Sequence, residues 1–334
     1  MRVPARLLRM FSALLLMLFL LPLTMSAEGP RFDSLYVFGD SLADIGNDLI
    51  LSKALGADPA IPPSTSPHRT YFAGRFSNGP VGFEYLWQLL SGEAPGSPNG
   101  LKPSLAAAPL GATGAVDFAF GGTGTPYIDQ TPGGFFAPGL KGQVELFRIG
   151  LRGRRPSKHA LYAIVTGAND YRNDPFNVPM DPHDVVSNIA DAVHTLYQLG
   201  ARDVIVLNLP DLGLEPANAG DPGPASALSA FHNALLANAL TTLASQLPKL
   251  NLIQADFAQA FLQLPAGMNQ VVPALDALFP PGFHMSACLF IDPVTCADVP
   301  FFDVGDQFLF WDIVHPTTAA HRVLGDYLFQ LLVQ

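Results

Sequence analysis

Short apolar runs recur along the chain, and most of them end at glycine, proline or small polar residues. Runs of this kind are typical of strands covered on both faces, as in parallel sheets. We therefore predict a central, mainly parallel five-stranded sheet formed by Leu35–Phe38, Ala115–Phe120, Leu161–Val165, Asp203–Leu207 and Leu250–Gln254.

Two stretches between these runs have the spacing of amphipathic helices. Within Asp184–Leu199, apolar residues recur every three or four positions from Val185 to Leu196, and Gly200 suits the position after a helix end. Ala225–Leu247 is a second, longer stretch. Strands that alternate with helices form α/β folds with right-handed crossovers. The pattern predicts a three-layer α/β/α sandwich.

Small and polar residues follow three of the predicted strands, and the segments are Gly39-Asp40-Ser41, Gly121-Gly122-Thr123 and Gly167-Ala168-Asn169-Asp170. In parallel α/β sheets, functional residues lie beyond the carboxyl ends of the strands. We expect these three segments to meet at one site.

The N-terminal residues have the pattern of an export signal. Three arginines, Arg2, Arg6 and Arg9, precede the apolar run Met10–Leu23, and small residues follow up to Ala27. This order is typical of a secretory signal peptide. The run is short for a hydrocarbon layer of about 30 Å, although an uncleaved signal anchor is the alternative. We predict that residues 1–27 are removed, that residues 28–334 form a single domain, and that the protein is periplasmic or extracellular.

Composition narrows the class of protein. The chain is 49% hydrophobic and 14% charged, which excludes a disordered chain. Its formal charge of −10 argues against a nucleic acid as partner, because a phosphate backbone needs a basic face. Cys288 and Cys296 predict a disulfide bond if the protein is exported. The histidines show no metal-binding spacing, so we expect neither a metal nor an organic cofactor.

Ser41 and the pair Asp312 and His315 are candidates for nucleophilic catalysis. A lone serine after a strand also suits a helix N-cap, and Asp-x-x-His pairs are common on surfaces. Together they can form a triad in which Asp312 holds Nδ1–H of His315 and Nε2 accepts the proton of Ser41.

Such a triad needs donors for an oxyanion. Gly122 can present its backbone N–H without a side chain in the way, Asn169 can offer its amide, and Ser41 its own N–H. The alternatives are an ordinary turn at Gly121-Gly122 and an Asx turn at Asn169-Asp170.

Five segments of the chain resemble, in the same order, the conserved blocks of the GDSL family of lipases and esterases, also called SGNH hydrolases. They are Phe38–Asn47, Gly74–Val81, Asp117–Thr123, Gly167–Asp170 and Phe310–Thr317. One departure is Asp117, where many members carry asparagine; we expect little effect on chemistry. Arg75 and Asn78 of the second block are interpreted as loop and capping residues, with contact to the substrate as the alternative.

The resemblance implies a flavodoxin-like fold and a role for each matching residue. Ser41 would be the nucleophile, His315 the base and Asp312 its orienting acid. The oxyanion hole would be formed by Ser41, Gly122 and Asn169, with Gly122 favoured over Gly121 by the alignment of its block.

These expectations predict an exported serine hydrolase that cleaves lipid or other acyl esters through an acyl-enzyme, with no stable transmembrane segment after processing. Two enzymatic alternatives use the same triad: a polysaccharide O-acetylesterase and an acyltransferase. A binding protein without activity would lack a triad member, and none is missing here.

Overall fold

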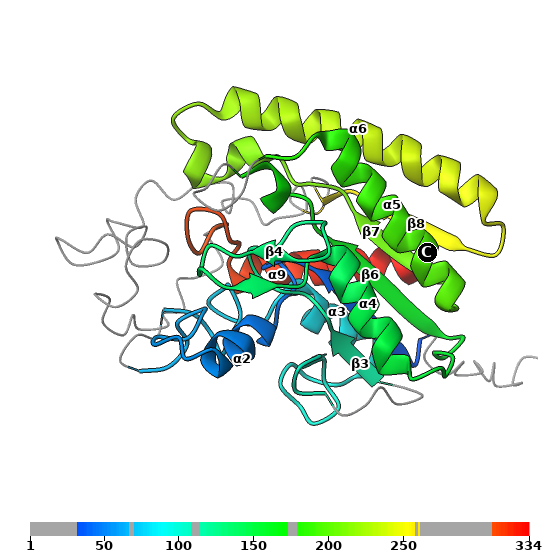
Figure 1. Ribbon diagram of the computed structural model, residues 1–334, viewed down its shortest axis with the longest axis horizontal. Coiled ribbons are helices and arrows are strands. Elements are labelled where there is room, and N and C mark those ends of the chain that lie inside the picture. The colour runs from blue at the N-terminus through cyan, green and yellow to red at the C-terminus, as the bar shows by residue number, and fades with distance from the viewer. Residues whose placement is uncertain are drawn as a thin grey trace, which may run out of the picture. The chain divides into compact units, whose positions relative to one another are not determined.

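The structure is a computed structural model that describes residues 32–66, 70–107, 114–172, 179–257, 260 and 309–333. Within them, parallel strands pair into one sheet (Figure 1). In spatial order the strands are β2 (Lys102–Pro103), β3 (Gly114–Asp117), β1 (Ser34–Gly39), β6 (Ala160–Val165), β7 (Asp203–Leu207) and β8 (Asn251–Ala255).

The sheet has six strands, whereas the sequence predicted five. The additional strand, β2, is only 2 residues long and pairs with Val116 and Asp117 at one edge. A strand this short carries no alternating or continuous apolar run, so the pattern could not reveal it. The prediction for β3 was also too long, because the chain leaves the ladder after Asp117 instead of at Phe120.

Helices cover both faces of the sheet, as predicted for a three-layer sandwich. Among the described residues, the helices are α2 (Asn47–Ala54), α3 (Gly82–Ser91), α4 (Leu140–Leu151), α5 (Pro182–Leu199), α6 (Pro222–Gln246) and α9 (Thr318–Val333). Short 3-10 turns span Asn169–Tyr171, Leu212–Leu214 and Pro216–Asn218. A separate two-stranded sheet pairs β4 (Asp129–Gln130) with β5 (Phe136–Ala137).

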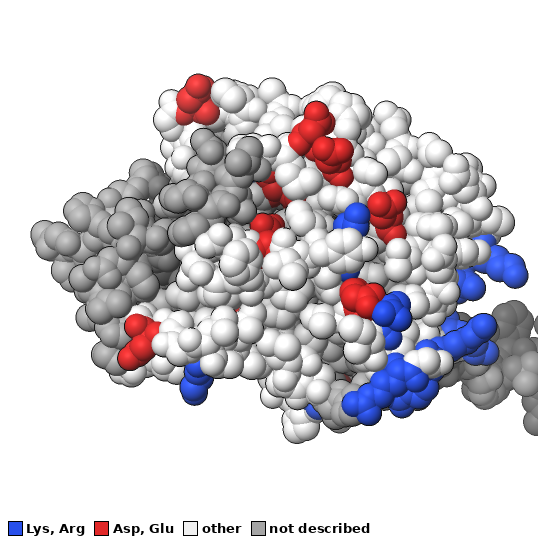
Figure 2. Space-filling view, viewed as in Figure 1, with Lys and Arg blue, Asp and Glu red and all other residues white. Residues whose placement is uncertain are grey.

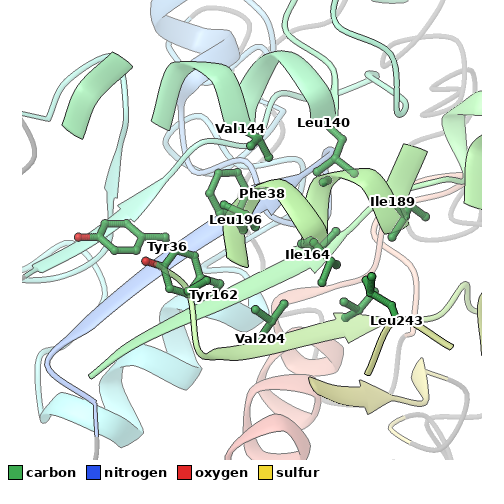
Figure 3. Close-up of a cluster of buried hydrophobic side chains, with 14 of the residues drawn as sticks. Tyr36, Phe38, Leu140, Val144, Tyr162, Ile164, Ile189, Leu196, Val204 and Leu243 are labelled. Carbon is green, nitrogen blue, oxygen red and sulfur yellow. The ribbon is translucent and has the colours of Figure 1, made fainter. Parts of the chain in front are cut away.

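Strand side chains alternate between two apolar layers. Tyr36 and Phe38 of β1 join a cluster that packs against α4, α5 and α6 (Figure 3). Leu35 and Val37 of the same strand join the cluster formed with α3 and α9. Since successive side chains of a strand point to opposite faces, apolar residues at every position bury both faces of β1. This explains why the strands appear in the sequence as continuous apolar runs.

Two predictions lie outside the described residues: the signal peptide at 1–27 and the disulfide between Cys288 and Cys296. In the part of the chain that is described, no helix combines the length and apolar character needed to cross a bilayer.

Candidate active site

The three polar segments predicted to meet do follow neighbouring strands. β1 lies between β3 and β6, and all three strands are parallel. Their carboxyl ends therefore lie at one edge of the sheet. Ser41 follows β1, Gly122 follows β3 and Asn169 follows β6, and all three residues line one cleft of about 600 Å³ together with His315.

Ser41 lies in a tight turn directly after β1. The N–H of Asp40 extends the ladder by donating to the carbonyl of Val165, and the N–H groups of Ala43 and Asp44 then donate to the carbonyl of Asp40. The next helix, α2, begins only at Asn47, so the N-cap interpretation of Ser41 is wrong. The turn leaves the Ser41 side chain only 7% exposed and at the edge of the cleft.

Gly39 and Gln143 hold the backbone that leads into this turn. The side-chain amide of Gln143 accepts from the N–H of Gly39 and donates to its carbonyl, both at 2.8 Å. A Cβ atom at Gly39 would overlap the carbonyl oxygen of Val165, so a side chain would push the two strand ends apart. The sequence analysis missed Gln143, which lies on α4 and contacts Gly39 only through the tertiary fold.

The structure brings His315 to Ser41. Nε2 of His315 is 2.8 Å from Oγ of Ser41, and Nδ1 is 2.6 Å from Oδ2 of Asp312. The other carboxylate oxygen of Asp312 accepts from the backbone N–H groups of Val314 and His315, at 2.8 and 2.7 Å. All three predicted side chains are buried and form one continuous hydrogen-bonded chain.

Asp312 and Asp40 both interact with His315, but their pKa values are shifted in opposite directions. Burial alone would raise the pKa of Asp312, but the charge of His315 and the hydrogen bonds that it and Val314 donate lower this pKa below its ordinary value. Asp40 has fewer compensating donors, and burial raises its pKa to about 7. Asp312 is therefore the carboxylate that stays ionised beside the imidazole.

The two glycines after β3 differ in what their N–H groups do. Gly121 donates its N–H to Oδ2 of the buried Asp44 at 3.1 Å, so this group is engaged. The N–H groups of Gly122 and Ser41 donate to no acceptor among the described residues. Gly122 has a φ of 70°, a conformation that a residue with a side chain adopts at a cost. Of the two glycines, Gly122 has the available donor.

Asn169 is held by contacts on both sides of its carboxamide. Its Nδ2 donates to the carbonyl of Thr123 at 3.0 Å, and its Oδ1 accepts from Nε of Arg172 at 3.1 Å. Arg172 in turn donates to both carboxylate oxygens of Glu215, at 3.1 and 3.2 Å. These bonds fix which end of the amide is the donor and leave its second N–H without a protein partner among the described residues. The sequence analysis missed Arg172 and Glu215, which carry no recognisable spacing.

Asp117, for which we expect little effect on chemistry, has a structural role at the end of β3. Its carboxylate accepts from the N–H groups of Ile45 and Ala119, at 3.1 and 2.9 Å. It therefore joins the end of β3 to the segment that follows Ser41. Burial raises the pKa of Asp117 well above its ordinary value, with the neighbouring charge of Asp44 adding to the effect.

The segment 70–78 packs against the loop that carries Asp312 and His315. Tyr71 donates its hydroxyl to Oδ2 of Asp312 at 2.7 Å, a contact that the sequence analysis missed. Arg75 pairs with Glu84 at the start of α3, and Asn78 accepts from the N–H of Thr318 at the start of α9. The interpretation of Arg75 and Asn78 as loop and capping residues is confirmed.

The cleft beside Ser41 is mainly apolar. Its volume of about 600 Å³ is in the range typical of small-molecule sites. The apolar residues that line it include Leu42, Ile61, Pro62, Phe76, Leu214, Phe257, Leu309, Phe310, Ile313 and Val314. Most of the described face in Figure 2 is uncharged, with most of its Lys and Arg gathered at the lower right and its acidic residues spread over the rest of the face.

Comparisons with known proteins agree with this geometry. Residues 35–328 match the family model described as GDSL-like Lipase/Acylhydrolase. The phosphatidylcholine-sterol acyltransferase of Aeromonas hydrophila is 28% identical over 330 residues, which cover 89% of each chain. A GDSL esterase/lipase of Arabidopsis thaliana is 28% identical over 343 residues, which cover 88% of each chain.

Among solved structures, a member of the lipolytic protein G-D-S-L family from Veillonella parvula DSM 2008 matches with a TM-score of 0.45 and 10% identity, over 90% of this chain and 98% of that one. The family match spans most of the sequence, from the first strand of the sheet to the last helix. The chain therefore belongs to the GDSL-like lipase/acylhydrolase family and is a carboxylic ester hydrolase.

Proposed function

We propose that this protein is an exported serine hydrolase that cleaves lipid or other acyl esters through an acyl-enzyme. The observation that carries the proposal is the 2.8 Å contact between Nε2 of His315 and Oγ of Ser41. Because the Asp312 carboxylate accepts the Nδ1 proton, Nε2 is left with its lone pair toward the serine hydroxyl. The imidazole is thus in the tautomer that a general base requires.

In the proposed reaction, Oγ of Ser41 attacks the ester carbonyl carbon while Nε2 of His315 takes the hydroxyl proton. The carbonyl oxygen becomes an oxyanion, for which the N–H groups of Ser41 and Gly122 and the amide of Asn169 are the donors. Collapse of the intermediate breaks the bond to the alcohol, which leaves with the proton from His315. Water then attacks the acyl-enzyme by the same route, and the acid is released.

The lining of the cleft supports an acyl group as the part of the substrate that is bound. Apolar side chains surround the space next to Ser41, and burial of an acyl chain there would contribute about 0.8 kcal/mol for each methylene group. The charged side chains Arg172 and Glu215 at the cleft are paired with each other, so they offer little net charge to a substrate.

Acyl transfer is a second candidate activity, and one of the relatives favours it. The matched protein of Aeromonas hydrophila is named as an acyltransferase. The two activities differ only in whether water or an alcohol attacks the acyl-enzyme. Product analysis of a medium-chain ester, with and without an added sterol or aliphatic alcohol, measures the ratio of free acid to new ester.

The N-terminal pattern supports export, with removal of residues 1–27 leaving residues 28–334 as one hydrolase domain. In an oxidising compartment Cys288 and Cys296 would form a disulfide. Expression of the full chain in bacteria, fractionation, and N-terminal sequencing of the product test these proposals. A protein that stays in the cytoplasm with Met1 intact would contradict export.

Covalent labelling tests the nucleophile without a choice of substrate. A fluorophosphonate reacts with an activated serine, and peptide mapping of the labelled protein locates the modified residue. We expect the label on Ser41 alone. A panel of medium-chain lipid esters and acetylated polysaccharides then separates a lipid esterase from an O-acetylesterase. Label on another serine would contradict the assignment.

A further inference from the structure

The Asp312 carboxylate accepts four hydrogen bonds, and one of them comes from outside its own loop. Oδ1 accepts from the N–H groups of Val314 and His315. Oδ2 accepts from Nδ1 of His315 at 2.6 Å and from the hydroxyl of Tyr71 at 2.7 Å. A carboxylate has about four lone-pair positions, so its acceptor capacity is filled. The Tyr71 hydroxyl therefore shares an oxygen atom with the imidazole proton.

The direction of this hydrogen bond is fixed. Asp312 is ionised and can only accept, so Tyr71 donates. Burial, together with the charge of Asp312, raises the pKa of Tyr71 well above its ordinary value. The hydroxyl therefore holds its proton more tightly than that of an exposed tyrosine.

Tyr71 is held firmly in this position. The residue is 1% exposed, and its N–H donates to the carbonyl of Pro63 at 2.9 Å. Its ring lies edge-on to the rings of Phe76 and His315, with centroids 5.7 and 6.4 Å away.

Further bonds join the two loops around this contact. Nε1 of Trp311 donates to the carbonyl of Thr70 at 3.2 Å. Oγ of Ser77 donates to the carbonyl of Pro316 at 2.9 Å. The Tyr71 hydroxyl is thus placed by the same packing that holds the loop of Asp312 and His315.

We propose that Tyr71 is a positioning residue that acts through Asp312 and sets how strongly this carboxylate stabilises the protonated form of His315. The inference rests on the proposed function of the triad. A donor on Oδ2 withdraws negative charge from the oxygen atom that faces Nδ1. Less charge there means weaker stabilisation of the imidazolium. Tyr71 therefore keeps His315 from holding its proton too tightly, and so favours its return to the leaving alcohol.

The variant Tyr71→Phe removes the donor and retains the ring. The three remaining donors, from Val314 and His315, keep the carboxylate in place, so its charge changes more than its position. The imidazolium is then stabilised more strongly, and a higher pH is needed to free Nε2. We expect the acid limb of the kcat/KM profile on a soluble p-nitrophenyl ester to move to higher pH by roughly half a unit to one unit.

Tyr85→Phe is the matched control. It also removes a partly buried tyrosine hydroxyl, which lies 2.7 Å from Oγ1 of Thr318. Thr318 is close to His315 in the sequence, but this hydroxyl does not contact Asp312. We expect its acid limb to coincide with that of the wild type. Among the described residues, the titratable groups that interact electrostatically with His315 or Asp312 include Asp40, Glu215 and His321, and Arg172 acts on Asp40 and Glu215. Neither variant substitutes any of these residues.

A second variant should shift the acid limb of the kcat/KM profile in the opposite direction. Incorporation of 3-fluorotyrosine at position 71 makes the hydroxyl more acidic and a stronger donor, so the acid limb should move to lower pH. Proton NMR gives a readout without substrate: the low-field Nδ1 proton of His315 should shift in the Tyr71→Phe protein and not in the Tyr85→Phe protein.

The outcomes separate this inference from the proposed function. An acid limb that stays at the wild-type pH in both Tyr71 variants, even with a lower rate, overturns the role of Tyr71 while leaving the triad intact. An unchanged Nδ1 resonance in Tyr71→Phe does the same. Full activity of a Ser41→Ala protein would instead overturn the triad itself. Circular dichroism checks that each variant is folded.

Discussion

Nε2 of His315 lies 2.8 Å from Oγ of Ser41, although 274 positions separate the two residues along the chain. The contact depends on the conformation of two segments. One is the turn after β1, which is held through Gly39, and the other is the loop before α9, which is held through Asp312. Each is held by backbone hydrogen bonds to a buried side chain, which leaves Nε2 of His315 and Oγ of Ser41 little freedom.

Replacement of the proposed nucleophile is the simplest test of the site. Ser41→Ala removes the Oγ atom without enlarging the side chain, so the fold should persist while hydrolysis of a p-nitrophenyl ester is lost. The measurement is the initial rate, with the melting temperature as a check of folding. Ser97→Ala, whose hydroxyl contacts Glu93 away from the cleft, should keep the wild-type rate. A substantial residual rate in Ser41→Ala would show that another residue is the nucleophile.

The amide of Asn169 should matter to the transition state more than to the ground state. Asn169→Ala removes one of the proposed oxyanion donors, and we expect kcat to fall by roughly 10²-fold with little change in KM. Steady-state kinetics on a soluble ester measures both. Asn238→Ala, on the exposed side of α6, serves as the control. An unchanged kcat in Asn169→Ala would exclude this residue from the oxyanion site.

A comparison of two glycines with similar φ angles distinguishes the effect of backbone strain from the loss of an N–H donor. Gly122 and Gly134 have φ values of 70° and 79°, so alanine at either position costs about 1 kcal/mol in backbone strain. A Cβ atom at Gly122 would lie 2.5 Å from Cδ of Pro132, whereas one at Gly134 meets nothing within 4 Å. We expect Gly122→Ala to displace the N–H donor and lower kcat by at least about tenfold. Similar kcat values for the two variants would contradict the role of Gly122.

The buried histidine His232 should make stability depend on pH. Burial lowers its pKa to about 4 from 6.5. Between these values the unfolded chain binds the proton and the folded chain does not, so this contribution to stability is complete above pH 6.5 and is lost progressively as the pH falls toward 4. The loss should reach up to about 3 kcal/mol. Urea unfolding of the wild type and His232→Gln at pH 7.5 and 4.5 measures it.

In that experiment His232→Gln should lose less stability over the pH range than the wild type, because the substituted side chain takes up no proton. The exposed His194 provides the matched control, since His194→Gln should follow the wild type. Parallel losses of unfolding free energy in the wild type and His232→Gln would show that His232 is not held neutral by the fold.

The sequence was informative wherever a short segment carries its own pattern. Apolar runs with sharp ends located β1, β6 and β7, because strands buried on both faces need apolar side chains at successive positions. The polar residues after β1, β3 and β6 followed from the rule that parallel strands end at one edge of a sheet. The matching blocks then singled out Ser41, Asp312 and His315 for particular roles.

The tertiary structure alone decided those contacts that leave no local pattern in the sequence. Tyr71 reaches Asp312 across 241 positions, and Gln143 reaches Gly39 across 104. Both side chains meet their partners only after the sheet and helices have packed, so no period or spacing in the sequence encodes these contacts. The preference for Gly122 over Gly121, which the alignment of its block already favoured, gains a physical reason in three dimensions, because the N–H of Gly121 donates to Asp44. Local propensity and burial placed the strands and their polar ends, whereas long-range hydrogen bonds determined how the side chains at those ends are held and which donors stay available.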